Sequence, residues 1–293
     1  MIYHYCSADT FIAICSTRKI RLTNILHMND STELFVGLEA WDRGVRTDML
    51  AAEDRPVALA VRQAMEFELG MRSVFMVSCF TRETDSLIHW SYADDGRGVS
   101  LGFDGTRLAG KSVIFEMSYD EQEHIEEVMS VFNEEVKLLK YESGMSVQNI
   151  IEDREAVVHI ATLLLRELTA LKNPGYMEER EVRWMQLAQR ILERPPRRLI
   201  YGGVTRNGKQ LSEAQPVGFW TKGGRVSPYI DVPWLKPDGS YDDVVVEAAS
   251  SPLREVHLGP NNPSSVRDVC DFLHTVGLPW VKVTQGGKAY KCF

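Results

Sequence analysis

The segment DEQEHIEEVMSVFNEEVKLLKY (residues 120–141) determines the fold class, because it begins a long helical pattern between two groups of strand-like segments. Acidic residues open this segment and Lys137 and Lys140 close it, an order that stabilises a helix through its dipole. A second helical pattern, VQNIIEDREAVVHIATLLLRELTAL (residues 147–171), ends at the turn formed by residues 173–175. We therefore expect a two-helix insertion at about residues 120–172.

Strand-like segments lie on both sides of this insertion. We expect strands at residues 20–24, 73–80, 99–103, 112–119, 181–187, 198–201, 217–220, 226–233, 244–247, 255–258 and 280–284. Further helical patterns occupy residues 29–44, 53–69 and 264–276. Strands in runs and helices in runs favour an α+β fold over a doubly wound sheet. We expect a single domain over residues 1–293.

Composition limits the classes of protein that the chain can represent. Of the 293 residues 44% are hydrophobic, the net charge is −8, and the five cysteines form no CxxC pair. We expect a cytoplasmic protein without disulfides, because the start of the chain lacks a signal-peptide pattern and no run of about 18 apolar residues could span a membrane. The acidic balance disfavours general binding of nucleic-acid backbones.

Standard catalytic signatures are absent from the sequence. We find no P-loop, no GxGxxG after a strand, no HExxH and no GxSxG, and the seven histidines lack metal-ligand spacing. The sequence therefore predicts no metal site and no Rossmann-type cofactor.

Residues 3–7 (YHYCS) form a first candidate segment, a strand that leads into a helix. His4 could donate a hydrogen bond to a sugar hydroxyl, and Ser7 at the helix start suits a phosphate group. The alternative is that His4 is a core histidine between two aromatic residues.

Residues 89–93 (HWSYA) form a second candidate segment, in a short helix. Trp90 and Tyr92 could stack on a flat ring, or they could anchor the core beneath the sheet.

Residues 172–184 (KNPGYMEEREVRW) form a third candidate segment. If residues 179–183 are a strand, Glu179, Glu181 and Arg183 project from one face. Two carboxylates and a guanidinium on one face are costly unless they are paired or functional. The alternative is a surface salt-bridge ladder on an edge strand.

The chain resembles the bacterial domain-of-unknown-function family 2971. The resemblance rests on YHYCS (3–7), LTN (22–24), MNDSTE (28–33), VSCFTRETDSLIHWSYADDGRGVSLGFD (77–104), KNPGYMEEREVRW (172–184) and EVHLGP (255–260). These motifs follow the order of the family and cover most of the chain. Two positions depart from the pattern, since the family often has Thr in place of Cys6 and Trp in place of Tyr176.

The motif order of this family is in turn similar to that of ADP-ribosyltransferases of the His–Tyr–Glu kind. This likeness implies split, mostly antiparallel sheets with NAD, as substrate, in the cleft between them. His4 would hold the adenosine ribose, and Glu181, or alternatively Glu179, would be the catalytic glutamate. Tyr92 would stack on nicotinamide, with Trp90 and Tyr5 as alternatives.

Further roles follow from the same likeness and from the residues around the glutamates. Arg183, or alternatively Arg180, would bind the pyrophosphate or orient the glutamate, and no metal is required. The acceptor of the ADP-ribosyl group, whether protein, nucleic acid, small molecule or water, stays open. The amphipathic pattern of the inserted helices fits either a gate over the cleft or the interface of a homodimer.

Three functions are consistent with these observations. The first is an NAD-dependent ADP-ribosyltransferase or NAD glycohydrolase, as a toxin or phage-defence effector. The second is a catalytically silent nucleotide-binding or sensor domain. The third is a nucleic-acid-processing hydrolase that uses Glu179, Glu181 and Arg183 differently, with Cys79 and His89 as a minor nucleophilic version.

Overall fold

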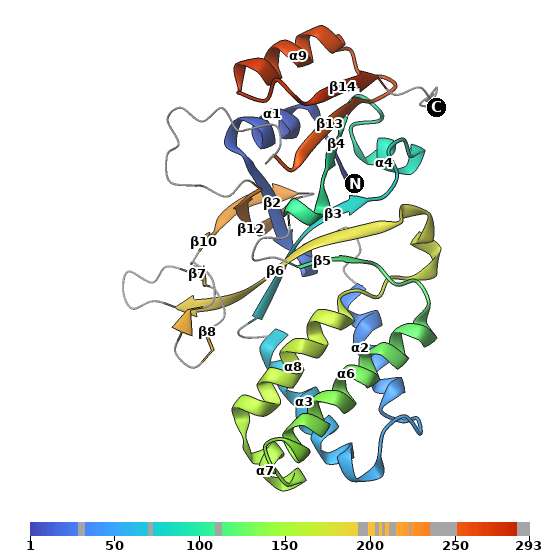
Figure 1. The fold of residues 1–293 in the computed structure, drawn as a ribbon, viewed down its shortest axis with the longest axis vertical. Coiled ribbons are helices and arrows are strands. Elements are labelled where there is room, and N and C mark those ends of the chain that lie inside the picture. Colours follow the sequence, from blue (N-terminus) through green and yellow to red (C-terminus); the bar gives the residue numbers. More distant parts are fainter. Residues whose placement is uncertain are drawn as a thin grey trace.

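The protein consists of a large sheet with a bundle of helices against one end of it, as the computed structural model in Figure 1 shows. The structure describes residues 1–28, 33–69, 73–108, 113–192, 199–202, 205–206, 209–210, 215–222, 224–234 and 251–285. The expected strand at 244–247 and the expected helix start at 29–32 lie outside these ranges. The α+β class is confirmed.

The strands pair almost entirely in antiparallel fashion. They are β1 (Ile2–Cys6), β2 (Lys19–Asn24), β3 (Ser73–Thr81), β4 (Val99–Phe103), β5 (Val113–Glu116), β6 (Glu181–Leu192), β7 (Leu199–Gly202), β8 (Thr205–Arg206), β9 (Lys209–Gln210), β10 (Gln215–Pro216), β11 (Gly218–Lys222), β12 (Arg225–Pro233), β13 (Leu253–Leu258) and β14 (Lys282–Gln285). Among the named strands described, β13 and β14 form the parallel pair.

The sheet divides into two branches at strand β3, because one edge of β3 pairs with two different strands. One side of β3 pairs with β6 along its whole length. On the other side, Thr81 pairs with Tyr3 of β1, whereas Val77 pairs with Thr23 of β2. Strands β4, β13 and β14 continue from β1, and β12 and β11 continue from β2. The expected, mostly antiparallel pairing is confirmed, and these strands lie in one branched sheet rather than in two separate ones.

The helices fall into two groups. They are α1 (Ala8–Thr17), α2 (Glu33–Gly44), α3 (Arg55–Phe67), α4 (Leu87–Tyr92), α5 (Gly105–Leu108), α6 (Glu121–Tyr141), α7 (Val147–Glu152), α8 (Arg154–Leu168) and α9 (Val266–Thr275). Figure 1 shows α2, α3, α6, α7 and α8 together as the bundle, and α1 and α9 at the opposite end.

The expectation of a two-helix insertion needs correction. The second expected helix is two helices, α7 and α8, because Asp153 breaks it with an extended backbone (φ −80°, ψ 95°). Its carboxylate accepts hydrogen bonds from the backbone N–H groups of Glu155 and Ala156 at 2.9 and 3.1 Å, which caps α8. These helices share one apolar core with α2 and α3, so they are part of a five-helix bundle.

The two faces of the sheet bury different cores, because successive side chains of a strand point to opposite faces. Val182 and Trp184 of β6 belong to a core with α1 and α9. Met185 of β6 and Val77 of β3 belong to the core of the helical bundle. We call these two sides of the sheet the α1/α9 face and the bundle face.

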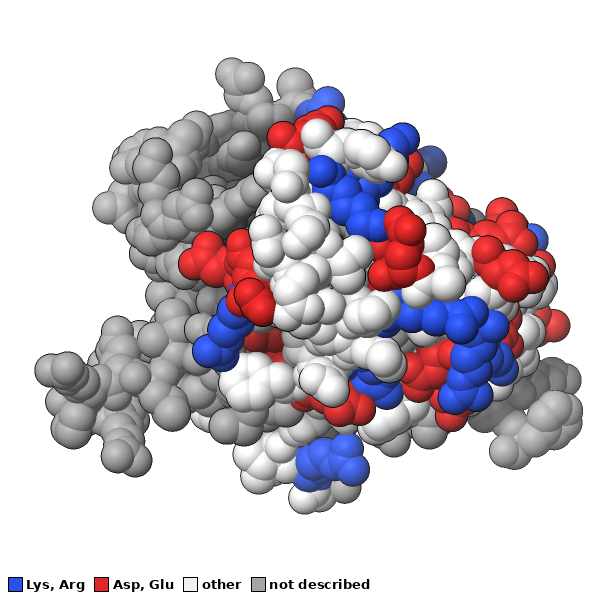
Figure 2. All heavy atoms as spheres, turned by 90° about the horizontal axis from the view of Figure 1, so that it is seen from below, with Lys and Arg blue, Asp and Glu red and all other residues white. Residues whose placement is uncertain are grey.

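The surface of the bundle carries charges of both signs. Seen from the bundle end in Figure 2, acidic and basic side chains of the described residues alternate around an uncharged area. This distribution agrees with the modest net charge of −8. Among the described residues, no helix is long and apolar enough to cross a membrane.

Candidate functional site

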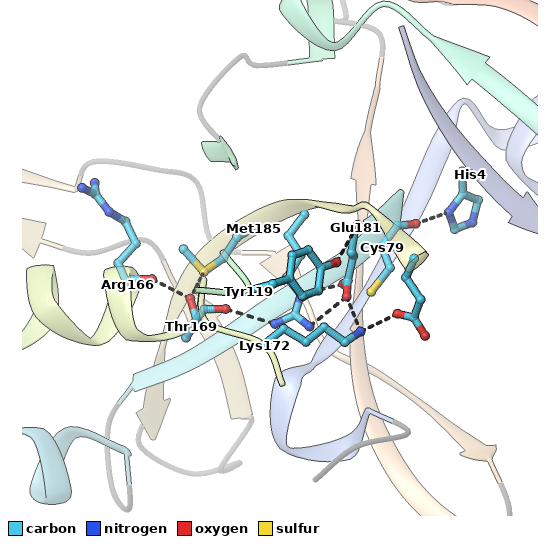
Figure 3. A network of polar contacts seen from close by, with 10 residues as sticks. His4, Cys79, Tyr119, Arg166, Thr169, Lys172, Glu181 and Met185 are labelled. Atoms are coloured by element: carbon cyan, nitrogen blue, oxygen red, sulfur yellow. Dashed lines mark hydrogen bonds and ion pairs between the residues drawn. The ribbon is translucent and has the colours of Figure 1, made fainter. Parts of the chain in front are cut away.

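Lys172 forms ion pairs with two carboxylates on the bundle face of the sheet. It follows α8, and its backbone N–H donates to the carbonyl of Ser118 at 2.9 Å. Its side chain is 7% exposed, and Nζ lies 2.6 Å from Glu179 Oε2 and 2.6 Å from Glu181 Oε2. Figure 3 shows the ammonium group reaching Glu181 from a separate segment of the chain. The arrangement is a buried ammonium shared by two carboxylates.

The backbone between the two glutamates is held in an unusual conformation. Arg180 has φ 41° and ψ 49°, in the left-handed region that costs a non-glycine residue about 1 kcal/mol or more. Hydrogen bonds fix both neighbours, since Thr81 Oγ1 donates to the Glu179 carbonyl at 2.8 Å and the Glu181 N–H donates to Tyr119 Oη at 3.0 Å. The strand starts at Glu181, as expected for residues 181–187, and it does not extend back to Glu179, which ends the preceding 3-10 helix.

Arg183 completes the pairing of Glu181. Its guanidinium, 1% exposed, donates from Nε to Glu181 Oε1 at 2.7 Å and from Nη1 to the carbonyl of Thr169 at 3.1 Å. Burial raises the pKa of the Glu181 carboxyl, but the charges and hydrogen bonds of Arg183, followed by the charge of Lys172, outweigh burial and lower this pKa to about 2. Glu181 is therefore a carboxylate at neutral pH.

Cys79 lies beside this network with its side chain turned toward Glu181 (Figure 3). Burial raises the pKa of the Cys79 thiol well above its usual range, and the Glu181 charge raises it further. A thiol in this environment stays protonated, which removes the nucleophile that a Cys79–His89 mechanism would require.

Exposed aromatic side chains border the network. Tyr92 is 61% exposed and its hydroxyl donates to Glu179 Oε1 at 3.4 Å. Tyr176 is 40% exposed, and its ring centroid lies 5.1 Å from Lys172 Nζ. His89 lies within electrostatic range of Glu179, and burial lowers the pKa of its imidazole, so the ring is neutral at pH 7. We call Lys172, Glu179, Glu181, Arg183, Tyr92 and Tyr176 the lysine cluster.

Trp90 and Tyr5 pack beside the helix and loop that carry Tyr92 of the lysine cluster. Trp90 is fully buried, and its Nε1 donates to Asp85 Oδ1 at 2.7 Å, so it anchors α4 and cannot stack on a ligand. Tyr5 packs against Trp90 with ring centroids 4.7 Å apart, and its hydroxyl donates to the carbonyl of Glu83 at 3.0 Å. Both residues hold the loop and helix that carry Tyr92.

The structure does not bring His4 into the lysine cluster. His4 lies on the same face of β1 as Ile2 and Cys6, so it points to the α1/α9 face, where its ring packs on Phe80 with ring centroids 5.3 Å apart. Its Nδ1–H donates to the backbone carbonyl of Cys79 at 2.9 Å, which places it on the far side of β3 in Figure 3. Ser7 caps α1 by accepting from the N–H of Thr10 at 3.3 Å, on a helix that packs on the α1/α9 face.

Two members of the lysine cluster, Lys172 and Tyr176, and the neighbouring Tyr119 were not predicted as site residues from the sequence. Lys172 and Tyr176 lie in the third candidate segment, and a basic residue just after a helix and nine positions before Glu181 was the available signal. Tyr119 left no such signal, because only the folded chain places its hydroxyl beside the Glu181 N–H. Within the described ranges, no group of three or more His, Cys, Asp or Glu side chains could hold a metal ion.

Comparison with known proteins gives one match. No significant match to the chain exists among curated proteins or among solved structures. Residues 90–184 match the sequence model of a family described as "Protein of unknown function (DUF2971)". This segment runs from α4 into β6 and supplies all six residues of the lysine cluster. Residues 90–184 of the chain are therefore similar to the DUF2971 family.

Proposed function

We propose that the protein is an NAD-dependent ADP-ribosyltransferase or NAD glycohydrolase whose reaction centre is the lysine cluster. One observation carries this proposal: Glu179 and Glu181 share the Lys172 ammonium at 2.6 Å each, beside the exposed rings of Tyr92 and Tyr176. Carboxylates fixed next to aromatic surface suit a flat cationic ring joined to a ribose. The division of the antiparallel sheet at β3 supports an ADP-ribosyltransferase-like fold.

The carboxylates would stabilise the transition state. Cleavage breaks the bond between the nicotinamide nitrogen and ribose C1′, and the electron pair leaves with nicotinamide. Positive charge then develops on the ribose, as in glycoside cleavage, and a fixed carboxylate stabilises it. The acceptor, or water, forms the new bond to C1′ and gives up its proton to a base.

Glu179 is the better candidate for direct contact with the ribose. Its side chain is 13% exposed, against 4% for Glu181, and it carries the bond from Tyr92. Glu181 has both oxygens engaged by Arg183 and Lys172, so it would position Lys172 and thereby Glu179. His4 and Ser7 have no part in this proposal, because His4 points to the other face and Ser7 caps α1.

Incubation of the purified protein with NAD, following nicotinamide release, tests the proposal. We expect release by the wild type and a loss of at least about a hundredfold in Glu179→Gln and in Glu181→Gln, the size typical of one lost electrostatic contact to a transition state. Glu178→Gln is the matched control, because Glu178 is an exposed neighbour with the same charge. Release that is equal in all four proteins would place the chemistry elsewhere.

A catalytically silent binding domain is the second candidate. It is favoured by the charge balance of the cluster, in which two buried cations neutralise two carboxylates. Calorimetry separates the two candidates, since a binding domain would bind NAD without releasing nicotinamide.

A further inference from the structure

Helix α6, the long green helix of the bundle in Figure 1, is exposed along one side. Its other side is buried in the bundle core, for example at Val128 and Phe132. The exposed side is formed by residues at helical spacings of three and four, which lie on one face: Glu127, Ser130, Glu134, Lys137, Leu138 and Tyr141. We call these six residues the α6 stripe. The lysine cluster uses none of them, so the function proposed above leaves this surface unexplained.

A hollow of about 450 Å³ lies beside the α6 stripe. Its lining includes two apolar side chains and two residues of the stripe, namely Met49, Met129, Ser130 and Lys137. A second hollow of about 390 Å³ adjoins it, because Met49 and Lys137 line both. Methionine side chains adapt their shape to a neighbouring apolar group. The two hollows therefore suit a large, partly apolar side chain that enters from outside.

Two charged residues at the middle of the α6 stripe have no ion pair within the described part of the chain. They are Glu134 and Lys137, and both are exposed. Lys140 of the same helix, by contrast, pairs with Glu53 at 2.9 Å. Glu134 and Lys137 have opposite signs and lie at equal distances from the midpoint between them. This arrangement is complementary to a second copy of itself.

A two-fold axis through that midpoint fixes which residues meet. In an antiparallel pair of α6 helices, Glu134 of each copy faces Lys137 of the other, as in an isologous interface. A parallel pair would place Glu134 against Glu134 and Lys137 against Lys137, and like charges repel. The charges of the stripe thus select the antiparallel arrangement.

The same axis brings Tyr141 to the hollow. Ser130 and Tyr141 are also equally far from the midpoint, so Tyr141 of one copy lies beside Ser130 of the other, at the edge of the larger hollow. The Tyr141 side chain is 80% exposed, and the burial of an aromatic ring is favourable. We propose that the protein forms a symmetric dimer through the α6 stripe, in which Tyr141 of each copy fills the hollow of the other.

The length of the stripe sets the strength of this dimer. From Glu127 to Tyr141 the stripe spans about 21 Å, at about 1.5 Å per residue. A helix pair of this length buries less than the roughly 1,200 Å² of a standard stable interface, so the dimer is weak. We expect a dissociation constant on the order of 10 µM.

Sedimentation velocity between about 1 µM and about 200 µM protein measures the association. We expect the wild type to change from monomer to dimer over this range. Glu134→Lys and Lys137→Glu should each weaken the dimer by at least about tenfold, because like charges then face each other. An equimolar mixture of these two variants should form a dimer at least as tight as that of the wild type, because every facing pair is then opposite in sign.

Two matched controls separate the interface from general effects of charge and apolar surface. Glu178→Lys reverses the charge of an exposed glutamate outside α6, and Leu59→Ala shortens an apolar side chain of α3 that is 62% exposed. Neither change should alter the dissociation constant. Tyr141→Ala should raise it about tenfold, because the aromatic side chain that fills the hollow is lost.

Three results would overturn the α6 dimer. A wild type that stays monomeric at about 200 µM would leave the stripe to a different protein. A Glu134→Lys dimer as tight as that of the wild type would place the interface elsewhere, and so would a mixture of the two charge-reversal variants that does not associate. Circular dichroism checks the fold of each variant. If a charge-reversal variant does not fold, the comparison of Tyr141→Ala with Leu59→Ala decides.

Discussion

Replacement of Lys172 by methionine should destabilise the protein by about 3 kcal/mol. The unbranched side chain is shorter by one atom and loses the charge that Glu179 and Glu181 share at 2.6 Å each. Removal of one partner from a buried ion pair costs about 3 to 5 kcal/mol, because the remaining charge stays buried. We choose the lower end because Arg183 still neutralises Glu181 after the change.

The pKa of Glu181 gives an independent scale for this cost. A fall from 4.5 to about 2 corresponds to about 3 kcal/mol in favour of the charged form, and Arg183 and Lys172 share it. Because the folded-state pKa is lowered, this stabilisation is complete above pH 4.5 and is lost as pH falls toward 2. The difference between wild type and Lys172→Met should therefore shrink below about pH 4.5.

Urea unfolding at pH 7 and at pH 3.5 measures both effects. Arg82→Met is the control, because Arg82 pairs with Glu116 at 2.6 Å while both side chains are largely exposed, at 47% and 66%. Pairs at the surface contribute about 1 kcal/mol or less. Equal losses in Lys172→Met and Arg82→Met at pH 7 would refute the argument that burial gives the lysine cluster its energy.

Three other properties follow from the structure. His124 is 1% exposed, and burial lowers the pKa of its imidazole. The unfolding free energy should therefore fall as pH drops below about 6.5, because the unfolded chain binds the proton more readily. His124→Leu should remove part of that fall in a pH series of urea titrations. Trp90→Ala should cost about 3 to 5 kcal/mol in chemical unfolding, whereas Tyr92→Ala should cost below about 1 kcal/mol, since only Trp90 is buried. Native Cys79 should resist alkylation by iodoacetamide at pH 8, detected by mass spectrometry, until the protein unfolds.

Much of the fold was predictable because its signals are local. The helix expected over residues 53–69 is α3 (Arg55–Phe67), with Pro56 in its first turn as its sequence indicates. The apolar run at 73–80 is β3. The break at Asp153 was missed, because an aspartate is tolerated inside a helix and its capping bonds appear only when α7 and α8 pack separately.

The candidate site was predictable only in part, because it depends on pairing between distant strands. The pattern of β6 was enough to place Glu181 and Arg183 on one face. Alternation along β1 also separates His4 from its neighbours Tyr3 and Tyr5. The pairing of Tyr3 with Thr81 places Tyr3, and not His4, on the face that carries Glu181. No local pattern in the sequence shows that register.

The position of β3 at the branch point also has a consequence for the order in which the chain folds. Its partners are strands that begin at residues 2, 19 and 181. During synthesis β3 emerges after its partners β1 and β2. Its other edge can pair with β6 only after about a hundred further residues have been made. Long-range pairing of this kind is slow and leaves an unpaired edge exposed. Helices α6, α7 and α8, made in that interval, pack on the bundle face, and a nascent chain that stops before residue 181 would have a helical bundle but an incomplete lysine cluster.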